Sequence, residues 1–250
     1  MINWVVPEQV PGLALWPLLL VLAVMVIVNV VNNRVAPQTH YLLWAFGFAV
    51  ILLAIGLLDG CSWTDMGLGR SSLVPGLIWG GLCIAAIAMV YLIGSLMRRT
   101  RTAFHDERMA DLSARGLFFQ AMIEVPLGTV LLEEIAFRSV LFAMLARRYG
   151  LVWAVVISCL AFGLWHVLPS IGTHEQNPAL GSVVGEGRRG NILAVLLSVV
   201  TTGLSGILFI GLRLVSGSVL APMGFHWATN GLGYAFGWVL IRLRDRSAHK

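Results

Sequence analysis

Two adjacent glutamates inside an apolar stretch are the residues of this sequence best suited to chemistry. Glu133 and Glu134 open the motif EEIAFR, which ends at Arg138. Residues four apart share a helical face, so Arg138 is predicted to pair with Glu134 and neutralise its charge. Adjacent helical residues point about 100° apart, so Glu133 should face elsewhere, without a partner in its own helix. A carboxylate in that position can accept a proton, which makes Glu133 the candidate general base.

Two further motifs carry imidazoles and an amide. Phe162 and His166 bound the motif FGLWH, and His226 and Asn230 bound HWATN. His226 and Asn230 share a helical face and offer two hydrogen-bond donors to one point, as an oxyanion site needs. Pro222 is predicted to break or kink the helix just before them, which frees backbone groups. Each motif alone also fits a structural role, such as a hydrogen bond between neighbouring helices.

The chain that must position these residues is strongly apolar. It has 250 residues, of which 58% are hydrophobic and 12% charged, and its mean hydropathy is +0.85. Soluble domains carry about 25% charged residues, so the composition excludes a soluble enzyme and a disordered regulator. The basic residues lie between apolar runs and form no basic face with interleaved aromatics, so no nucleic-acid partner is expected. The length suits one domain, and we predict a single integral membrane domain over 1–250.

Crossing a bilayer takes about 20 mostly apolar residues per helix. We therefore predict an all-α, polytopic bundle of about seven transmembrane helices, with lipids as its surroundings. The approximate limits of the seven stretches are 12–31, 41–58, 73–97, 117–145, 151–168, 192–212 and 219–240.

The distribution of Arg and Lys predicts an orientation. With the N-terminus outside, twelve basic residues fall in inner segments and four in outer ones, which favours N-out and C-in. The connection 98–116 mixes charged and apolar residues and is predicted to be a cytoplasmic amphipathic helix. The connection 169–191 is rich in Gly, Pro, Ser and Asn, which predicts a mobile loop, either a plain connector or a lid.

Together the three motifs resemble the pattern of the CPBP family of intramembrane proteases, which includes the CAAX prenyl endopeptidases of the Rce1 type and many bacterial Abi proteins. That pattern is EExxxR, FxxxH and HxxxN on successive helices, and it covers about 117–231 here, the predicted catalytic core. The resemblance implies that Glu133 activates water held by His166, while His226 and Asn230 stabilise the oxyanion. It implies supporting roles for Glu134, Arg138, Phe162 and Pro222. The family's prenyl proteases have eight helices, so an eighth span is possible here.

The resemblance implies an intramembrane endopeptidase of a bacterial cytoplasmic membrane, acting on a membrane-associated or lipid-modified peptide without a metal. A zinc or other divalent ion held by Glu133, His166 and His226 is the alternative, because two His and one Glu form a catalytic zinc set. A rhomboid-type serine protease is a second alternative, since GLSG at 203–206 matches GxSG. A proton-coupled transporter is a third, with the acids and imidazoles as a relay. No oligomeric state is indicated.

Overall fold

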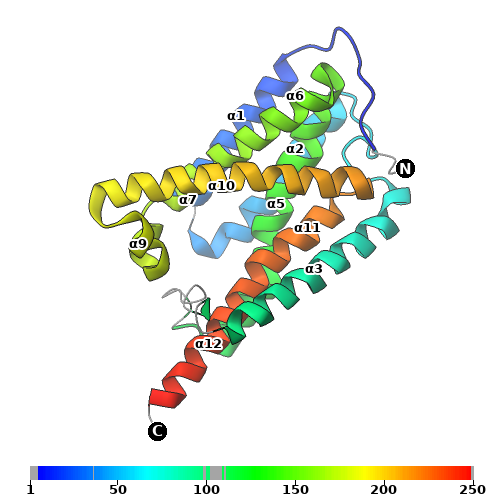
Figure 1. Cartoon of the computed structure of the whole chain (residues 1–250). Coiled ribbons are helices and arrows are strands. Elements are labelled where there is room, and N and C mark those ends of the chain that lie inside the picture. The colour runs from blue at the N-terminus through cyan, green and yellow to red at the C-terminus, as the bar shows by residue number, and fades with distance from the viewer. Residues whose placement is uncertain (1–4, 36, 98–99, 102–108, 110, 249–250) are drawn as a thin grey trace.

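The chain is a bundle of helices, as predicted (Figure 1). The computed structural model describes residues 5–35, 37–97, 100–101, 109 and 111–248. No strand occurs in this part of the chain. The main helices are α1 (Trp16–Val30), α2 (Tyr41–Leu58), α3 (Leu73–Leu96), α6 (Phe142–Trp165), α10 (Gly187–Ser216), the shorter α11 (Leu220–Trp227) and α12 (Gly233–Ala248). Before α6, one continuous rod is formed by α4 (Ala114–Phe119), the π-helix η6 (Gln120–Val130), α5 (Leu131–Glu133) and the π-helix η7 (Glu134–Leu141).

Several helices are long and apolar enough to cross a membrane. Within the described residues there are five such segments: Trp16–Val35, Tyr41–Leu58, Arg70–Leu96, Ala114–Ser170 and Gly187–Ser216. The fourth has 57 residues and turns at Gly150, whose φ of 78° and ψ of 177° are not helical, so it contains two predicted spans. The last predicted span, 219–240, is helical but is not one of the five. The chain is thus a multi-pass membrane protein, and the predicted number of seven is approximate.

Alternate connections between the helices meet at one end of the bundle. The Val10 N–H donates to the carbonyl of Arg147 (2.8 Å), whose guanidinium donates to the Asp59 carbonyl (3.0 Å). The Val219 N–H donates to the Gly67 carbonyl (3.0 Å). Four segments therefore lie together at this end: the N-terminal segment, the connection after α2, the turn within α6 and the connection after α10. The C-terminal end of α12 lies far from this end (Figure 1).

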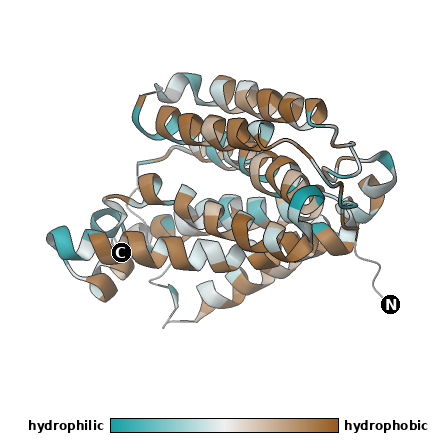
Figure 2. Cartoon of the chain, turned by 90° about the horizontal axis from the view of Figure 1, so that it is seen from above, coloured by the Kyte–Doolittle hydropathy of each residue, from teal (hydrophilic) through white to brown (hydrophobic). Residues whose placement is uncertain are grey.

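Much of the outer surface is apolar. Large hydrophobic side chains are exposed along α1, α2, α3 and α10, including Leu19, Leu43, Leu77 and Leu204. Figure 2 shows hydrophobic residues along most of the helices of the bundle. Contiguous apolar surface of this extent is unfavourable in water and natural in lipid.

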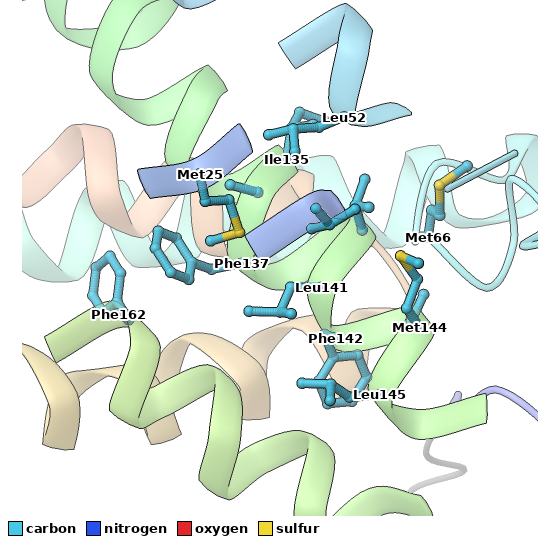
Figure 3. Close-up of a cluster of buried hydrophobic side chains, with 14 of the residues drawn as sticks. Met25, Leu52, Met66, Ile135, Phe137, Leu141, Phe142, Met144, Leu145 and Phe162 are labelled. Atoms are coloured by element: carbon cyan, nitrogen blue, oxygen red, sulfur yellow. The ribbon is translucent and has the colours of Figure 1, made fainter. Parts of the chain in front are cut away.

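The buried core surrounds η7 and fixes its position. A stripe on α1, with members three or four residues apart, faces inward: Leu18, Val21, Met25 and Val28. Figure 3 shows Met25 beside Phe137 of η7 and Leu52 of α2 beside Ile135. The second part of α6 closes the other side with Phe162. The EEIAFR motif is therefore enclosed by α1, α2 and the second part of α6.

The connection 169–191 differs from the predicted loop. It contains α8 (Thr173–Gln176) and α9 (Pro178–Val184), and α10 already begins at Gly187. Asn177 starts α9 because its side chain accepts the Leu180 N–H (3.1 Å), and the residue after it is a proline, which suits the first helical position. The Gly and Asn residues thus end and cap short helices. The amphipathic helix predicted over 98–116 falls largely outside the described residues.

Candidate active site

Three helical segments bring the motifs together. The turn at Gly150 folds the second part of α6 back along η7, so that the Phe137 and Phe162 rings lie 5.1 Å apart, centre to centre. α11 then approaches from the far end of the sequence, and the His226 ring centre lies 6.5 Å from that of Phe162. Residues of all three motifs therefore meet around Phe162.

The predicted pair of Glu134 and Arg138 is present and buried. Nη1 of Arg138 lies 3.3 Å from Oε1 of Glu134, and both side chains are at most 1% exposed. The guanidinium carbon also lies 3.8 Å from the centre of the Phe162 ring and 4.3 Å from that of Phe209. A cation between two aromatic faces is stabilised by their quadrupoles, which gives the phenylalanine of FxxxH a physical role. Phe209, on α10, carries no signal in the sequence.

The imidazole of His226 contacts both glutamates. Its Nδ1 lies 2.9 Å from Oε1 of Glu134, and its Nε2 lies 3.8 Å from Oε2 of Glu133. A regular α-helix was predicted to point Glu133 and Glu134 to different neighbours, whereas here both contact the same imidazole. The helix changes from α to π at Glu134, and the two nitrogens of one ring reach two neighbouring carboxylates. Such π segments are frequent at functional sites.

The two oxygens of Glu133 have different surroundings. Oε1 accepts a hydrogen bond from the indole N–H of Trp165 (3.0 Å). Oε2 has no hydrogen-bond partner among the described residues, although the side chain is only 8% exposed. Trp165 lies inside the FGLWH motif. Because a buried indole N–H needs an acceptor, its position in the motif could have predicted a polar partner. The indole fixes one oxygen and leaves the other available.

His166 lies next to this group, at the end of α6. Its Nδ1 is 2.8 Å from the carbonyl oxygen of Phe162. A carbonyl only accepts, so Nδ1 carries the proton and Nε2 of the neutral ring carries a lone pair. The ring lies 4.8 Å from that of Phe162, centre to centre, and is half-buried.

The structure does not bring Asn230 and His226 together by a hydrogen bond. The helix changes to the π-helix η8 (Ala228–Leu232) between the two, so residues four apart no longer share one face. The Asn230 side chain is half-buried and bonds to no other described residue. Pro222 lies in the first turn of α11, where its missing N–H has no cost, so it starts this helix and does not kink it. Glu124, away from the site, accepts a hydrogen bond from Gln120 (3.0 Å).

Close backbone contact holds α11 in place. A Cβ on Gly224 would lie 2.6 Å from the Cα of Gly80 in α3, a distance that no side chain tolerates. Two glycines facing each other let α3 and α11 touch, as small residues do between membrane helices. His226 lies two residues after this contact, so the packing sets its approach to the glutamates.

The serine of the alternative GLSG motif bonds within its own helix. Ser205 of the GLSG motif donates to the carbonyl of Thr202 (2.8 Å), while both nitrogens of His226 face the glutamates. Within the part of the chain that the structure describes, no three His, Cys, Asp or Glu side chains are grouped to hold a metal ion.

One comparison with known proteins finds a relationship. The family model described as type II CAAX prenyl endopeptidase Rce1-like matches residues 115–232. This range contains the three motifs and the buried group around Phe162, and the match confirms the resemblance seen in the sequence. No curated protein and no solved structure matches the chain.

Proposed function

We propose that the chain, whose residues 115–232 match the type II CAAX prenyl endopeptidase Rce1-like family, is an intramembrane endopeptidase. The observation that carries the proposal is the free oxygen of Glu133. A buried carboxylate oxygen without a hydrogen-bond partner, next to an imidazole nitrogen, is suited to take a proton from water.

The first step adds water to the scissile carbonyl. Oε2 of Glu133 takes one proton from a water molecule, and the water oxygen forms a bond to the carbonyl carbon. The electrons of the carbonyl π bond move to its oxygen, which becomes an oxyanion. Nε2 of His226 is directed towards Glu133 because Nδ1–H of the same ring donates to Glu134, an orientation like that of other carboxylate-bound histidines.

The second step breaks the peptide bond. The oxyanion collapses, the C–N bond breaks, and Glu133 returns its proton to the leaving nitrogen, so the products are an acid and an amine. We assign His166 to holding the water through its Nε2 lone pair. We assign an N–H on Nε2 of His226, which faces the space beside Glu133, and the Asn230 amide to stabilising the oxyanion. The Asn230 amide is not used by any other described residue, so its donors are available for this role.

We propose a glutamate-type reaction because Oε2 of Glu133 has no hydrogen-bond partner among the described residues, while Oε1 is held by Trp165. We propose that its substrate is a peptide near a C-terminus, lipid-modified or otherwise held at the membrane, as the family resemblance implies. We further propose a bacterial cytoplasmic membrane with the N-terminus outside, as the distribution of arginines favours.

The test is cleavage of a prenylated CAAX-type reporter peptide by the purified full chain in liposomes. Glu133→Gln is expected to lower kcat by at least about a hundredfold, because it removes the base. Glu124→Gln is the matched control, since it changes a carboxylate of the same rod that lies outside the site. In oriented vesicles, cleavage is expected only when the reporter is supplied on the side of the C-terminus.

Two outcomes would contradict the proposal. Full activity of Glu133→Gln, together with inactivation by a serine-directed phosphonate, would identify Ser205 as the nucleophile instead. Proton-coupled flux without any cleavage, retained when His226 and Asn230 are both changed to alanine, would identify a transporter.

A further inference from the structure

Asn29 is a polar residue at the inner end of an apolar stripe. It follows Val28 on the face of α1 that packs into the core, one helical turn after Met25. The side chain is 7% exposed, and its Nδ2 donates to the backbone carbonyl of Trp165 at 2.7 Å. A buried amide costs free energy unless it is hydrogen-bonded, so this bond is what makes Asn29 acceptable there.

The carbonyl of Trp165 needs this donor because of Pro169. In a helix it would accept the N–H of the residue four positions later, and that residue is a proline, which has none. The next carbonyl, that of His166, does receive its bond, from the Ser170 N–H at 3.2 Å. An unsatisfied carbonyl is costly in a membrane, and the Asn29 amide supplies the missing donor from another helix.

Trp165 connects this bond to the proposed active site. Its backbone is held by Asn29, and its indole N–H holds Oε1 of Glu133 at 3.0 Å. α1 lies outside residues 115–232, so the matched family region alone does not contain this support.

We propose that Asn29 and Trp165 are positioning residues for Glu133, with the α1 amide replacing the hydrogen bond that Pro169 cannot make. Asn29 fixes the end of α6, and Trp165 then fixes one oxygen of Glu133 so that the other faces His226. This inference rests on the proposed function for its effect on the reaction, and on the two hydrogen bonds for its structural part.

The kinetic test uses Pro169 to rescue Asn29. Asn29→Leu keeps the size of the side chain and removes the donor, and it is expected to lower kcat about tenfold with little change in KM, as loss of an orienting partner does. Pro169→Ala in the Asn29→Leu background restores a backbone N–H beneath the Trp165 carbonyl and is expected to recover most of kcat. Asn32→Leu is the matched control, because the Asn32 oxygen has no hydrogen-bond partner among the described residues. No recovery in the double variant, or an equal loss in Asn32→Leu, would overturn the proposal.

A spectroscopic test is independent of activity. In the full chain labelled with ¹⁵N at its tryptophan indoles, the Trp165 signal is identified by its loss in Trp165→Phe. This signal is expected to shift in both Glu133→Gln and Asn29→Leu, and to stay in place in Asn32→Leu. An unshifted signal in the first two variants would refute the coupling even if the protein is a protease. Shifts without any Glu133-dependent cleavage would instead support the two hydrogen bonds of Trp165 and refute the proposed function.

Discussion

Replacing Arg138 by methionine removes the cation of a fully buried ion pair while keeping a side chain of similar length. Two unit charges separated by the observed 3.3 Å attract by about 5 kcal/mol at an effective dielectric constant of about 20. Removing one partner of a buried pair costs about 3–5 kcal/mol, because the remaining Glu134 carboxylate loses its counter-ion and keeps only the hydrogen bond from His226. We therefore expect Arg138→Met to lose about 3–5 kcal/mol in its free energy of unfolding.

The assay is reversible unfolding in mixed SDS micelles, followed by circular dichroism. Glu134→Gln combined with Arg138→Met removes both charges, and it is expected to be more stable than Arg138→Met alone. Arg188→Met is the control, since this side chain is exposed at the start of α10, and surface changes of this kind stay within about 0.5 kcal/mol. A loss below about 1 kcal/mol for Arg138→Met, or a double variant as unstable as the summed single variants, would refute the electrostatic argument.

Two further predictions concern packing and a thiol. Gly224→Ala places a methyl group against the backbone of Gly80 and is expected to lower the free energy of unfolding by about 1–3 kcal/mol. It is also expected to lower kcat by displacing α11. Gly81→Ala is the control, because no atom lies within 4 Å of its new methyl group, and it is expected to do neither. Equal stability of the two variants in the same micelles would contradict the close contact. Burial raises the pKa of the Cys61 thiol, which lies in the connection after α2, so the reactive thiolate is scarce at neutral pH. In a variant without the other two cysteines, maleimide labelling of Cys61 should be slower than that of an exposed thiol at neutral pH and should accelerate as the pH rises, and a rate that does not depend on pH would count against this.

The local parts of the site follow from sequence spacing. A helix places residues four apart on one face, so the pairing of Glu134 with Arg138 is fixed within one turn and was predictable. The apolar stretches likewise predicted the membrane helices, because bilayer thickness sets their length. Pro169, four residues after Trp165, shows in the sequence that one carbonyl must find a donor elsewhere, although not which residue supplies it.

What only the tertiary structure decided are the partners that come from other helices. Periodicity relates residues within one helix and carries no information on how separate helices rotate against each other. Three contacts depend on that rotation: that of His226 with both glutamates, that of the Arg138 guanidinium with the Phe209 ring, and the hydrogen bond from Asn29 to Trp165. Close glycine contacts and the π segments at η7 and η8 set it, and they shift side chains from the faces that a regular α-helix would give them.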